Sequence, residues 1–515
     1  SPRRTDQEHV SPSATLRAGA PGRSGRLPAV TTADDLLSPI EPLAADAVEE
    51  WDDAADVVVV GLGCAGACAA IEAAEAGATV VVLEAAAFGG GTSALSGGLI
   101  YLGGGTPVQQ ACGFEDSPEN MANFLREACG PGVDEAKVQA YCDDSVGHFH
   151  WLVDHGVPFD GRYHPEHDRE PPDTSGLVFS GGEDSWPFNE VATPAARGHH
   201  PAYPDAAGGF LMQRLLAAVD EAGARVVTEA TVERLVVRDG AVVGVEVVVG
   251  GEPLRIAAGR GVVLTAGGFM FNRTMVERHC AAALRCNVPI GTEHDDGRAI
   301  RMAAGAGAAV DGLDRIEVGI PLAPPRSIVR GIIVNGHGER FMNEDTYAGR
   351  LGHEFLLHQD GRVFFVHDDD TFAVNIAGYK PRWVAETAGE LEDEMGLPSG
   401  SLQRTLDEYN RHAVDGHDPV YHKADEFVRV LEPPYGVVDL SVDRSWYATF
   451  TLGGLVTDPD GVVATDDGGV VPGLFAAGRT TVGIAVGGYV SGISLGDGTY
   501  FGRRAGRSAA AHRAP

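Results

Sequence analysis

The stretch Asp56-Val-Val-Val-Val-Gly61-Leu-Gly63-Cys-Ala-Gly66 decides the fold of this 515-residue chain. It is an apolar strand that enters a glycine turn and an alanine-rich helix, and Ala78-Thr-Val-Val-Val-Leu-Glu84 follows as a second strand that ends in an acid. The first glycine permits the tight turn, the second lets a pyrophosphate approach, and the third lets the helix pack on the strand. The closing glutamate lies at the spacing of a ribose-binding acid. A glycine-rich turn in an Ala/Gly-rich protein is the alternative, but the flanking strand and acid favour a dinucleotide site at the helix N-terminus.

Composition limits the possible partners. The formal net charge of -34 repels phosphate backbones and anionic lipid, so we expect neither nucleic-acid nor membrane-surface binding. The sequence contains no run of about 18 or more apolar residues, and we therefore expect no membrane span. Hydrophobic residues make up 44% of the chain, which is enough for buried cores in several domains.

The seven cysteines are odd in number and scattered, and they form no CxxC motif. This pattern predicts reduced thiols in a cytoplasmic protein. Cys64 and Cys68 lie four residues apart on the first helix but have no second ligand pair. We therefore expect them to be buried and inert, and we expect no metal site.

The composition and the motif content change three times along the chain. Residues 1–50 are rich in Pro, Ala, Ser and Arg and predict a disordered extension. Residues 51–275 carry the dinucleotide unit, 276–434 mix helices, short strands and charged loops, and glycine motifs return in 435–515. We predict an α/β fold, in which a discontinuous Rossmann-like domain (51–275 and 435–515) holds an inserted α+β substrate or cap domain (276–434).

Six motifs in order resemble the fumarate reductase/succinate dehydrogenase flavoprotein superfamily from about residue 55 to the C-terminus. They are Gly61-x-Gly63-x-x-Gly66, Gly89-Gly-Gly-Thr-Ser…Ser96-Gly-Gly98, Val263-Leu-Thr-Ala-Gly-Gly-Phe269, Asp296-Gly297, Gly338-Glu-Arg-Phe-Met-Asn-Glu344 and Leu474-Phe-Ala-Ala-Gly478.

The resemblance implies an extended FAD as the cofactor. It places Glu84 on the adenosine ribose, Val232 near the adenine, and the isoalloxazine beside Gly97, Gly98 and the Ser494-Leu495 turn. Gly91 stands where the succinate dehydrogenases carry the histidine that attaches the flavin, so we expect noncovalent FAD. The predicted cofactor-binding residues are Gly61, Gly63, Ala65, Gly66, Glu84, Gly91, Thr92, Ser93, Ser96, Gly97, Gly98, Val232, Ala266, Gly267, Gly268, Asp296, Gly478, Arg479, Gly488, Ser494 and Leu495.

The chain departs from the fumarate reductases at the residues that hold a dicarboxylate. Glu317-Val-Gly-Ile320 stands in place of His-Pro-Thr, and Thr449-Phe-Thr-Leu-Gly-Gly454 lacks the second histidine. Ser494 replaces one arginine, and the run Asn343-Glu-Asp-Thr-Tyr-Ala348 lacks the proton-donating one. Each lost charge-assisted hydrogen bond is worth about 1.5 to 3 kcal/mol, so we do not expect a dicarboxylate substrate.

The segment from Gly487 to Gly506 is similar to the C-terminal signature of the 3-ketosteroid dehydrogenases of this superfamily, especially the branch that introduces the 4,5 double bond. This resemblance implies that Tyr489, Ser491 and Tyr347 are catalytic and that a carbon-carbon double bond is made next to a ketone, with hydride transfer to flavin N5. The implied partners are a ketone or steroid-like substrate and an external, quinone-like electron acceptor.

Such a reaction needs a base for the α-proton, a stabiliser for the enolate and a hydride acceptor. We expect Ser491, relayed through Tyr489, to take the proton, and backbone N–H groups of the turn 487–489 to bind the enolate oxygen. Tyr347 would complete the network from the inserted domain, although it could instead be an interdomain packing residue, and Ser491 could cap the next helix. The run Arg197-Gly-His-His200 has no companion carboxylate nearby, and we interpret it as a loop that lines the flavin or is solvated.

Two alternatives stay open at this point. One is a flavin-dependent enoate or fumarate-type reductase, or a dehydrogenase of a non-steroid secondary metabolite. The other is a non-catalytic flavin-binding protein for electron relay, which the Tyr489/Ser491 pair disfavours.

Overall fold

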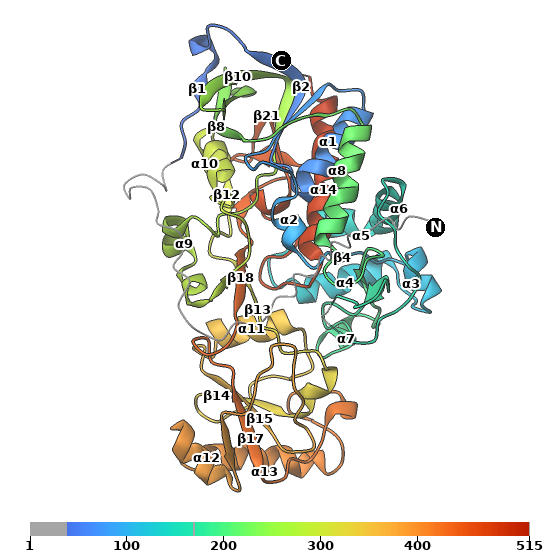
Figure 1. Ribbon diagram of the computed structural model, residues 1–515, viewed down its shortest axis with the longest axis vertical. Helices are drawn as coiled ribbons and strands as arrows, with labels where there is room; N and C mark the ends of the chain where they lie inside the picture. Colours follow the sequence, from blue (N-terminus) through green and yellow to red (C-terminus); the bar gives the residue numbers. More distant parts are fainter. Residues whose placement is uncertain (1–38, 168–169, 514–515) are drawn as a thin grey trace, which may run out of the picture.

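A mixed β-sheet forms the centre of the upper domain (Figure 1). The computed structural model describes residues 39–167 and 170–513. The nine-stranded sheet has the order β1-β8-β9-β10-β2-β3-β7, and β21 pairs with β10 and with β20. The strands are β1 (Leu43–Ala44), β2 (Asp53–Val60), β3 (Val80–Leu83), β7 (Arg225–Val227), β8 (Ala230–Arg238), β9 (Ala241–Val249), β10 (Glu252–Leu264), β20 (Val462–Ala464) and β21 (Val470–Ala476).

The parallel part of this sheet is β7-β3-β2-β10-β21. The run Val57–Val60 in β2 is buried, as a strand covered on both faces requires. Helices α1 (Cys64–Glu75), α8 (Gly208–Glu221) and α14 (Ile493–Ala511) lie side by side on one face (Figure 1). The predicted α/β class with a Rossmann-like sheet is confirmed.

The close approach of α14 to α1 joins the two ends of the domain. A Cβ on Gly502 would lie 2.4 Å from the Ala65 carbonyl oxygen, and one on Gly506 would lie 2.1 Å from that of Ala69. Only glycine at both positions lets the two backbones pack at this distance. The contact brings the C-terminal segment next to the first glycine turn.

A helical region, which includes the helices α4, α5 and α6, lies beside α14 at the right of Figure 1. The region also contains a small sheet in the order β4-β6-β5. Its elements are α2 (Gly91–Leu95), β4 (Ile100–Tyr101), α3 (Pro107–Ala111), α4 (Pro118–Ala128), α5 (Glu135–Asp143), α6 (Ser145–Asp154), β5 (Leu177–Val178), α7 (Phe188–Val191) and β6 (Gly198–His199).

The interpretation of Arg197-Gly-His-His200 as a flavin-lining or solvated loop is wrong. Arg197 is buried and donates two hydrogen bonds to Asp116, at 2.9 Å from Nε and 2.8 Å from Nη2. His199 is also buried and forms a 2.7 Å hydrogen bond with the Thr106 hydroxyl. The companion carboxylate lies far upstream in the sequence, where a local pattern could not reveal it.

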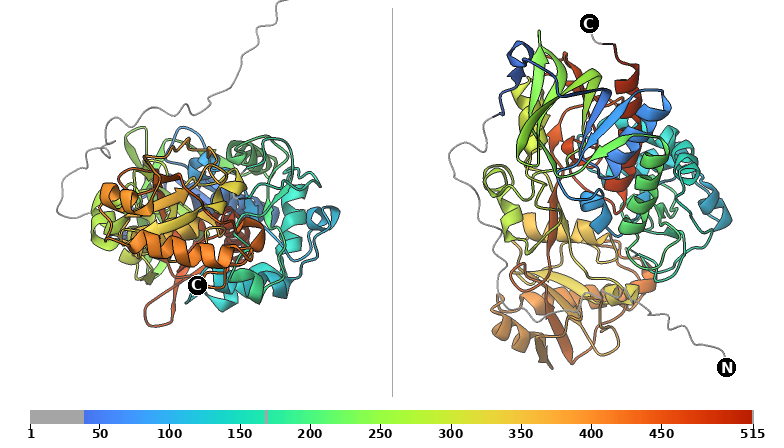
Figure 2. Two further views of the ribbon diagram at one scale, coloured as in Figure 1. Left: turned by 90° about the horizontal axis from the view of Figure 1, so that it is seen from below. Right: turned by 45° about the horizontal axis from the view of Figure 1, so that its top comes forward.

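A lower layer is built around the sheet β14-β15-β17-β16. Figure 2 (left), seen from below, shows α12 and α13 in orange against this sheet, where they share an apolar core with its strands. The elements from 273 to 455 are α9 (Arg273–His279), β11 (Val288–Pro289), α10 (Arg298–Gly305), β12 (Val310–Asp311), β13 (Ile316–Gly319), β14 (Ile332–Asn335), α11 (Ala348–Leu357), β15 (Val363–His367), β16 (Trp383–Ala385), α12 (Ala388–Met395), α13 (Ser401–Ala413), β17 (Tyr435–Asp439), β18 (Ala448–Thr451) and β19 (Gly454–Leu455).

The segment 276–434, predicted as an insertion, has elements in both layers. Its helix α10 packs against β8 of the upper sheet, whereas its strands β14 and β15 lie at the opposite end of the molecule (Figure 1). Strand β13 pairs with β18 between the two layers. The division at residues 275 and 434 stays a prediction.

The predicted extension 1–50 divides in two. Residues 1–38 lie outside the described residues, but 39–50 are not an extension. Strand β1 pairs in parallel with β8, and the Ile40 N–H donates to the Arg301 carbonyl at 3.0 Å. The segment pairs with β8 because the backbone N–H and C=O groups at the open edge of β8 need hydrogen-bond partners. None of the helices in the described ranges is long and apolar enough to cross a membrane.

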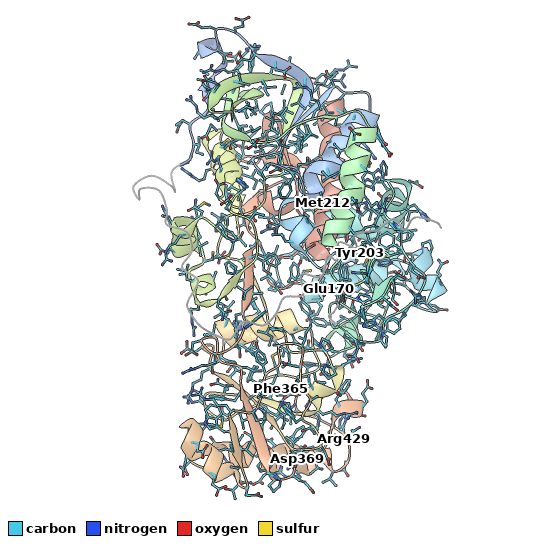
Figure 3. All side chains as sticks on the ribbon, in the orientation of Figure 1. Glu170, Tyr203, Met212, Phe365, Asp369 and Arg429 are labelled. Carbon is cyan, nitrogen blue, oxygen red and sulfur yellow. The ribbon has the colours of Figure 1, made fainter. Side chains whose placement is uncertain are left out.

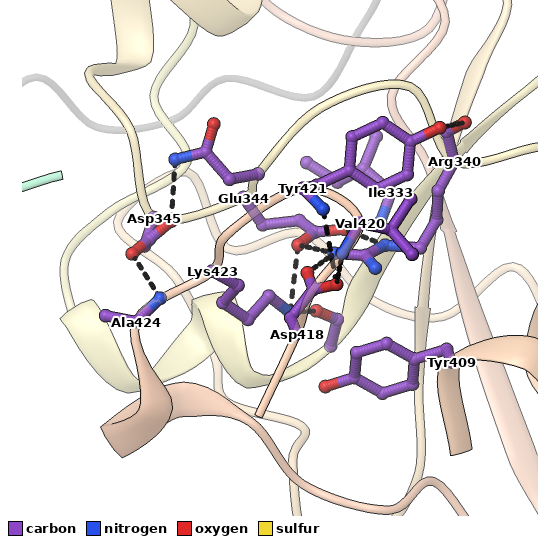
Figure 4. A network of polar contacts seen from close by, with 12 residues as sticks. Ile333, Arg340, Glu344, Asp345, Tyr409, Asp418, Val420, Tyr421, Lys423 and Ala424 are labelled. Atoms are coloured by element: carbon purple, nitrogen blue, oxygen red, sulfur yellow. Dashed lines mark hydrogen bonds and ion pairs between the residues drawn. The ribbon is translucent and has the colours of Figure 1, made fainter. Parts of the chain in front are cut away.

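A buried ionic network ties the lower layer to the loop before α11 (Figure 4). Glu344 accepts hydrogen bonds from Arg340 at 3.0 and 2.8 Å, and lies 2.9 Å from Lys423 Nζ. Arg340 also binds Asp418 at 2.8 Å. Burial alone would raise the pKa of Glu344, but the two cations hold it below its ordinary value. The carboxylate is therefore charged at neutral pH and compensates both cations.

We predict that Glu344→Gln lowers the free energy of unfolding by about 3 to 5 kcal/mol, because the substitution leaves buried cations without their shared anion. Urea unfolding of the purified protein measures this change. Glu277→Gln is the control, since the Arg273–Glu277 pair is about half exposed and exposed pairs contribute at most about 1 kcal/mol. Equal effects of the two substitutions would contradict the prediction.

Candidate active site

The described residues enclose a cavity of about 790 Å³ that runs from the first glycine turn to the strands between the two layers. Its volume lies in the range of about 300 to 1,000 Å³ that is typical of small-molecule sites. Glu170, labelled in Figure 3, lines it where the layers meet. The predicted site residues that line it are Gly61, Gly63, Ala65, Glu84, Gly91, Thr92, Ser93, Ser96, Gly97, Gly98, Val232, Ala266, Gly267, Asp296, Tyr347, Gly478, Arg479, Tyr489, Ser491, Ser494 and Leu495.

Three predicted cofactor residues do not line the cavity. Gly66 supports the turn from behind, because a Cβ there would lie 2.0 Å from the Gly61 carbonyl oxygen. Gly268 donates its N–H to Asp295 at 2.9 Å. Gly488 packs on the end of α4, where a Cβ would lie 2.3 Å from the Ala128 carbonyl oxygen. These glycines shape the walls.

At one end of the cavity, the glycine turn fits a pyrophosphate and ribose. Gly61 has φ +94°, and a Cβ on it would lie 2.7 Å from the Thr265 carbonyl oxygen. The N-cap of α1 is Gly63, which offers no side-chain cap, and the N-terminal dipole of the helix is left for an anion. The Glu84 carboxylate accepts the N–H of Leu62 at 2.7 Å and that of Ala86 at 2.9 Å, and is thereby held at the edge of the cavity.

Asp295 is a cavity residue that the sequence analysis missed. Its carboxylate accepts hydrogen bonds from Thr92 Oγ1 at 2.6 Å, from the Gly268 N–H at 2.9 Å and from Arg479 Nη2 at 2.9 Å. It joins three segments that are distant in the sequence. The resemblance pointed to its neighbour Asp296, which also lines the cavity but pairs with Arg298. The sequence did carry one signal for Asp295, because this residue directly precedes Asp296 in the run Asp295-Asp296-Gly297.

The opposite end of the cavity carries the predicted catalytic side chains. The Tyr489 hydroxyl accepts the Ser494 N–H at 3.4 Å, and its ring meets Phe450 edge to face at 5.4 Å between centroids. Burial raises the pKa of Tyr489, so its phenol is neutral at physiological pH. The Tyr347 hydroxyl lies 3.4 Å from Glu317 Oε1, a cavity residue that the sequence analysis noted only as a departure.

Ser491 is positioned through its backbone. Its N–H donates to the Ser180 carbonyl at 3.1 Å, and Ser180 Oγ donates to the Ser491 carbonyl at 3.0 Å. The residue before α14 is Gly492, which has a left-handed φ and makes no side-chain cap. The alternative that Ser491 caps this helix is therefore wrong.

The expected enolate site at the turn 487–489 needs correction at two of its three N–H groups. The N–H groups of Gly487 and Gly488 both donate to the Cys129 carbonyl, at 2.8 and 2.9 Å. These two hydrogen bonds fix the turn to the end of α4. Neither group is available to a substrate oxygen.

The arginine side chains that line the described cavity already have anionic partners. Arg298 pairs with Glu233 and Asp296, and Arg479 pairs with Asp295. No lysine of the described chain lines the cavity. The catalytic end is thus suited to a neutral, largely apolar molecule rather than to a dicarboxylate.

Comparison with known proteins agrees with this geometry. The family described as FAD binding domain matches residues 56–495. The crystal structure of 3-ketosteroid-delta4-(5alpha)-dehydrogenase from Rhodococcus jostii RHA1, in complex with 4-androstene-3,17-dione, is 47% identical, with a TM-score of 0.88 and coverage of 92% of this chain and 100% of that one.

Two further relatives are more distant. The 3-oxo-5-alpha-steroid 4-dehydrogenase of Comamonas testosteroni is 28% identical over 515 aligned residues, covering 87% of this chain and 97% of its own. The open conformation of a flavocytochrome c3 fumarate reductase is 24% identical, with a TM-score of 0.64 and coverage of 90% of this chain and 79% of that one, and it shows a shared fold.

We predict that Gly61→Ala yields protein with little bound flavin, because its Cβ would crowd the Thr265 backbone and displace the turn. The flavin-to-protein absorbance ratio measures the loss. Gly77→Ala is the matched control, since Gly77 has φ +82° and nothing lies within 4 Å of the added Cβ. The control should cost about 1 to 2 kcal/mol of backbone strain and keep its flavin. A normal flavin content in Gly61→Ala would contradict the assignment of this turn.

Proposed function

The chain belongs to the FAD-binding domain family, and we propose that it is an FAD-dependent dehydrogenase that introduces a carbon-carbon double bond next to the ketone of a steroid-like substrate. The family match and the relative at 47% identity confirm the resemblance and the cofactor that the sequence predicted. FAD, when bound, supplies the acceptor for the hydride that leaves the β-carbon.

The observation that carries the proposal is the composition of the catalytic end. Two tyrosine hydroxyls, a serine and a carboxyl group face a cavity whose described arginines are all paired with acids. A fumarate-type reductase needs free cations for its dicarboxylate, so this arrangement argues against that alternative. A flavoprotein that only relays electrons does not need these hydroxyl and carboxyl groups in the wall of its cavity.

The glycine turn, Glu84 and the segment Gly97–Gly98 would hold FAD along the upper wall, and Ser494–Leu495 would contact its reactive ring. The Tyr489 phenol then faces the substrate. In our proposal the α-proton passes to Tyr489 Oη while the phenolic proton moves on to Ser491 Oγ, which releases its own hydroxyl proton to water. The raised pKa of Tyr489 keeps the phenol protonated before the reaction, so proton transfer through it must be concerted.

We also propose an external, quinone-like electron acceptor and a cytoplasmic location. The acceptor follows from the absence of haem or iron–sulfur motifs in the sequence. All seven cysteines of the chain are free thiols, which supports a reducing compartment. A non-steroid ketone of similar size would fit the same chemistry, and the titration below distinguishes the two substrate classes.

We predict that saturated 3-ketosteroids bleach the oxidised flavin band in an anaerobic titration of the holoenzyme. In Tyr489→Phe, bleaching should slow by a factor of about 10² to 10⁴, the usual contribution of a positioned proton-transfer group. Rapid-mixing absorbance measures both rates. Tyr447→Phe is the control, because Tyr447 is buried outside the cavity and donates to the Leu440 carbonyl at 2.7 Å. Bleaching by dithionite but by no steroid would refute the steroid assignment.

A further inference from the structure

The ladder between β13 and β18 forms one wall of the catalytic end, between the two layers (Figure 1). Successive side chains of a strand point to opposite faces, so residues two apart share a face. Glu317 and Gly319 of β13 line the cavity, and so do Ala448 and Phe450 of β18. Val318, which lies between the first two, is fully buried on the other face. One face of the ladder is therefore turned to the cavity.

The register of the ladder divides this face into a large row and a small row. Glu317 lies opposite Phe450, and Gly319 lies opposite Ala448. The two rows are separated by two residues on each strand, which corresponds to about 6.6 Å. Phe450 of the large row contacts the Tyr489 ring edge to face. The large row therefore marks the reacting end of this wall.

The small row is the one farther from the cofactor-binding wall. At the other end of β18, the Thr451 hydroxyl accepts the Phe269 N–H at 3.2 Å, and a Cβ on Gly268 would lie 2.4 Å from the same oxygen. That end of the strand thus packs on the segment that follows β10. A ligand whose reacting ring lies beside Phe450 meets Ala448 when the rest of it extends along the strand, away from the cofactor.

Neither backbone conformation nor packing accounts for a glycine at position 319. Gly319 is the last residue of a strand, and its φ lies outside the left-handed region. A Cβ on it would meet no atom within 4 Å, its sequence neighbours aside. At Gly352 of α11, by contrast, a Cβ would lie 2.2 Å from the Val318 carbonyl oxygen, so packing requires that glycine.

A glycine in a strand weakens the strand and often marks the close approach of a ligand or of another backbone. No other backbone of the described chain approaches a Cβ at Gly319, which leaves a ligand as the reason for the open space. Ala448, on the opposite strand, adds only a methyl group. The two residues thus form a recess in the cavity wall.

The recess is apolar. Neither of its residues has a polar side chain, and Ile290 adds an apolar side chain from the strand on the other side of β18. The Ile290 N–H donates to the Thr449 carbonyl at 2.8 Å, which holds it in this position. Such a surface binds hydrocarbon by burial of apolar area rather than by hydrogen bonds.

Resting on the proposed dehydrogenation, we propose that Gly319 and Ala448 select the substrate by size: the ketone-bearing ring reacts beside Phe450, and further fused rings lie flat in the recess. A single-ring ketone leaves the recess to water and gains nothing from it. A polycyclic ketone buries additional apolar surface there, which strengthens its binding. The two residues act by contact and take no part in proton or hydride transfer.

Filling the recess tests this role. Gly319→Val places a side chain in it, and valine is favoured in strands, so the ladder should form as before. We expect the Kd of the holoenzyme for 4-androstene-3,17-dione, measured from the perturbation of the flavin band, to rise about tenfold or more, as overpacking predicts. Gly319→Ala should have a smaller effect of the same sign. Ala448→Val enters the recess from the opposite strand and should reproduce the loss.

A single-ring ketone separates size selection from general damage to the site. The Kd of cyclohexanone, measured by its competition with the steroid, should be nearly unchanged in Gly319→Val, because this molecule does not reach the recess. In the double variant Gly319→Val/Ala448→Val, the loss of steroid binding should be smaller than the sum of the two single losses in free energy, because both side chains fill the same space. Where cyclohexanone does not compete at all, the double variant decides.

Gly389→Val is the matched control. Gly389 is exposed on α12 in the lower layer, and a Cβ on it also meets nothing within 4 Å. This variant should bind the steroid like the wild type. Flavin content and the rate of reduction by dithionite should be unchanged in every variant, which shows that the cofactor site is intact.

The outcomes separate this inference from the proposed function. Unchanged steroid binding in both Gly319→Val and Ala448→Val, an equal loss of cyclohexanone and steroid binding, or fully additive losses in the double variant would overturn the size-selecting role while steroid turnover by the wild type stands. If no 3-ketosteroid binds to the wild type or bleaches its flavin, the proposed function fails and this inference fails with it.

Discussion

The contact between α1 and α14 is the constraint on which the rest of the structure depends. Gly502 and Gly506 let the last helix lie directly against the backbone of the first. Because α14 is fixed there, the loop before it is brought to the glycine turn after β2. Tyr489 and Ser494 thus reach a cavity whose other wall begins at Gly61. The active site is assembled from both ends of the chain, and a small-residue helix contact sets its dimensions.

The local part of this structure could be predicted from the sequence, and the non-local part could not. The strand–glycine–helix unit, the FAD-binding family and the α/β class follow from short motifs whose residues are neighbours in the chain. Asp295 and the Arg197–Asp116 pair were missed because their partners come from distant segments. The hydrogen bonds from the Gly487 and Gly488 N–H groups to the Cys129 carbonyl were missed for the same reason, because Cys129 is distant from both glycines in the sequence. The sequence pattern identified the Tyr347 position but gave no sign of Glu317 as its partner.

Two buried glutamates show how the surroundings decide the chemistry of a carboxyl group. Glu344 lies between Arg340 and Lys423, which hold its pKa below the ordinary value and make it a structural anion. Glu317 is buried to a similar degree but has only a phenol as its side-chain partner, and its pKa rises to about 8. The same residue type therefore stabilises the fold in one layer and supplies a titrating group to the cavity. Desolvation is common to both, and the neighbouring cations make the difference.

The ladder between β13 and β18 has a mechanical consequence. These strands run between the upper and lower layers, and they also carry Glu317 and Phe450 on the cavity wall. Any rocking of the lower layer against the upper one must bend this ladder. Because Glu317 and Phe450 lie on this ladder, any displacement of one layer against the other would also change the shape of the cavity wall that they form.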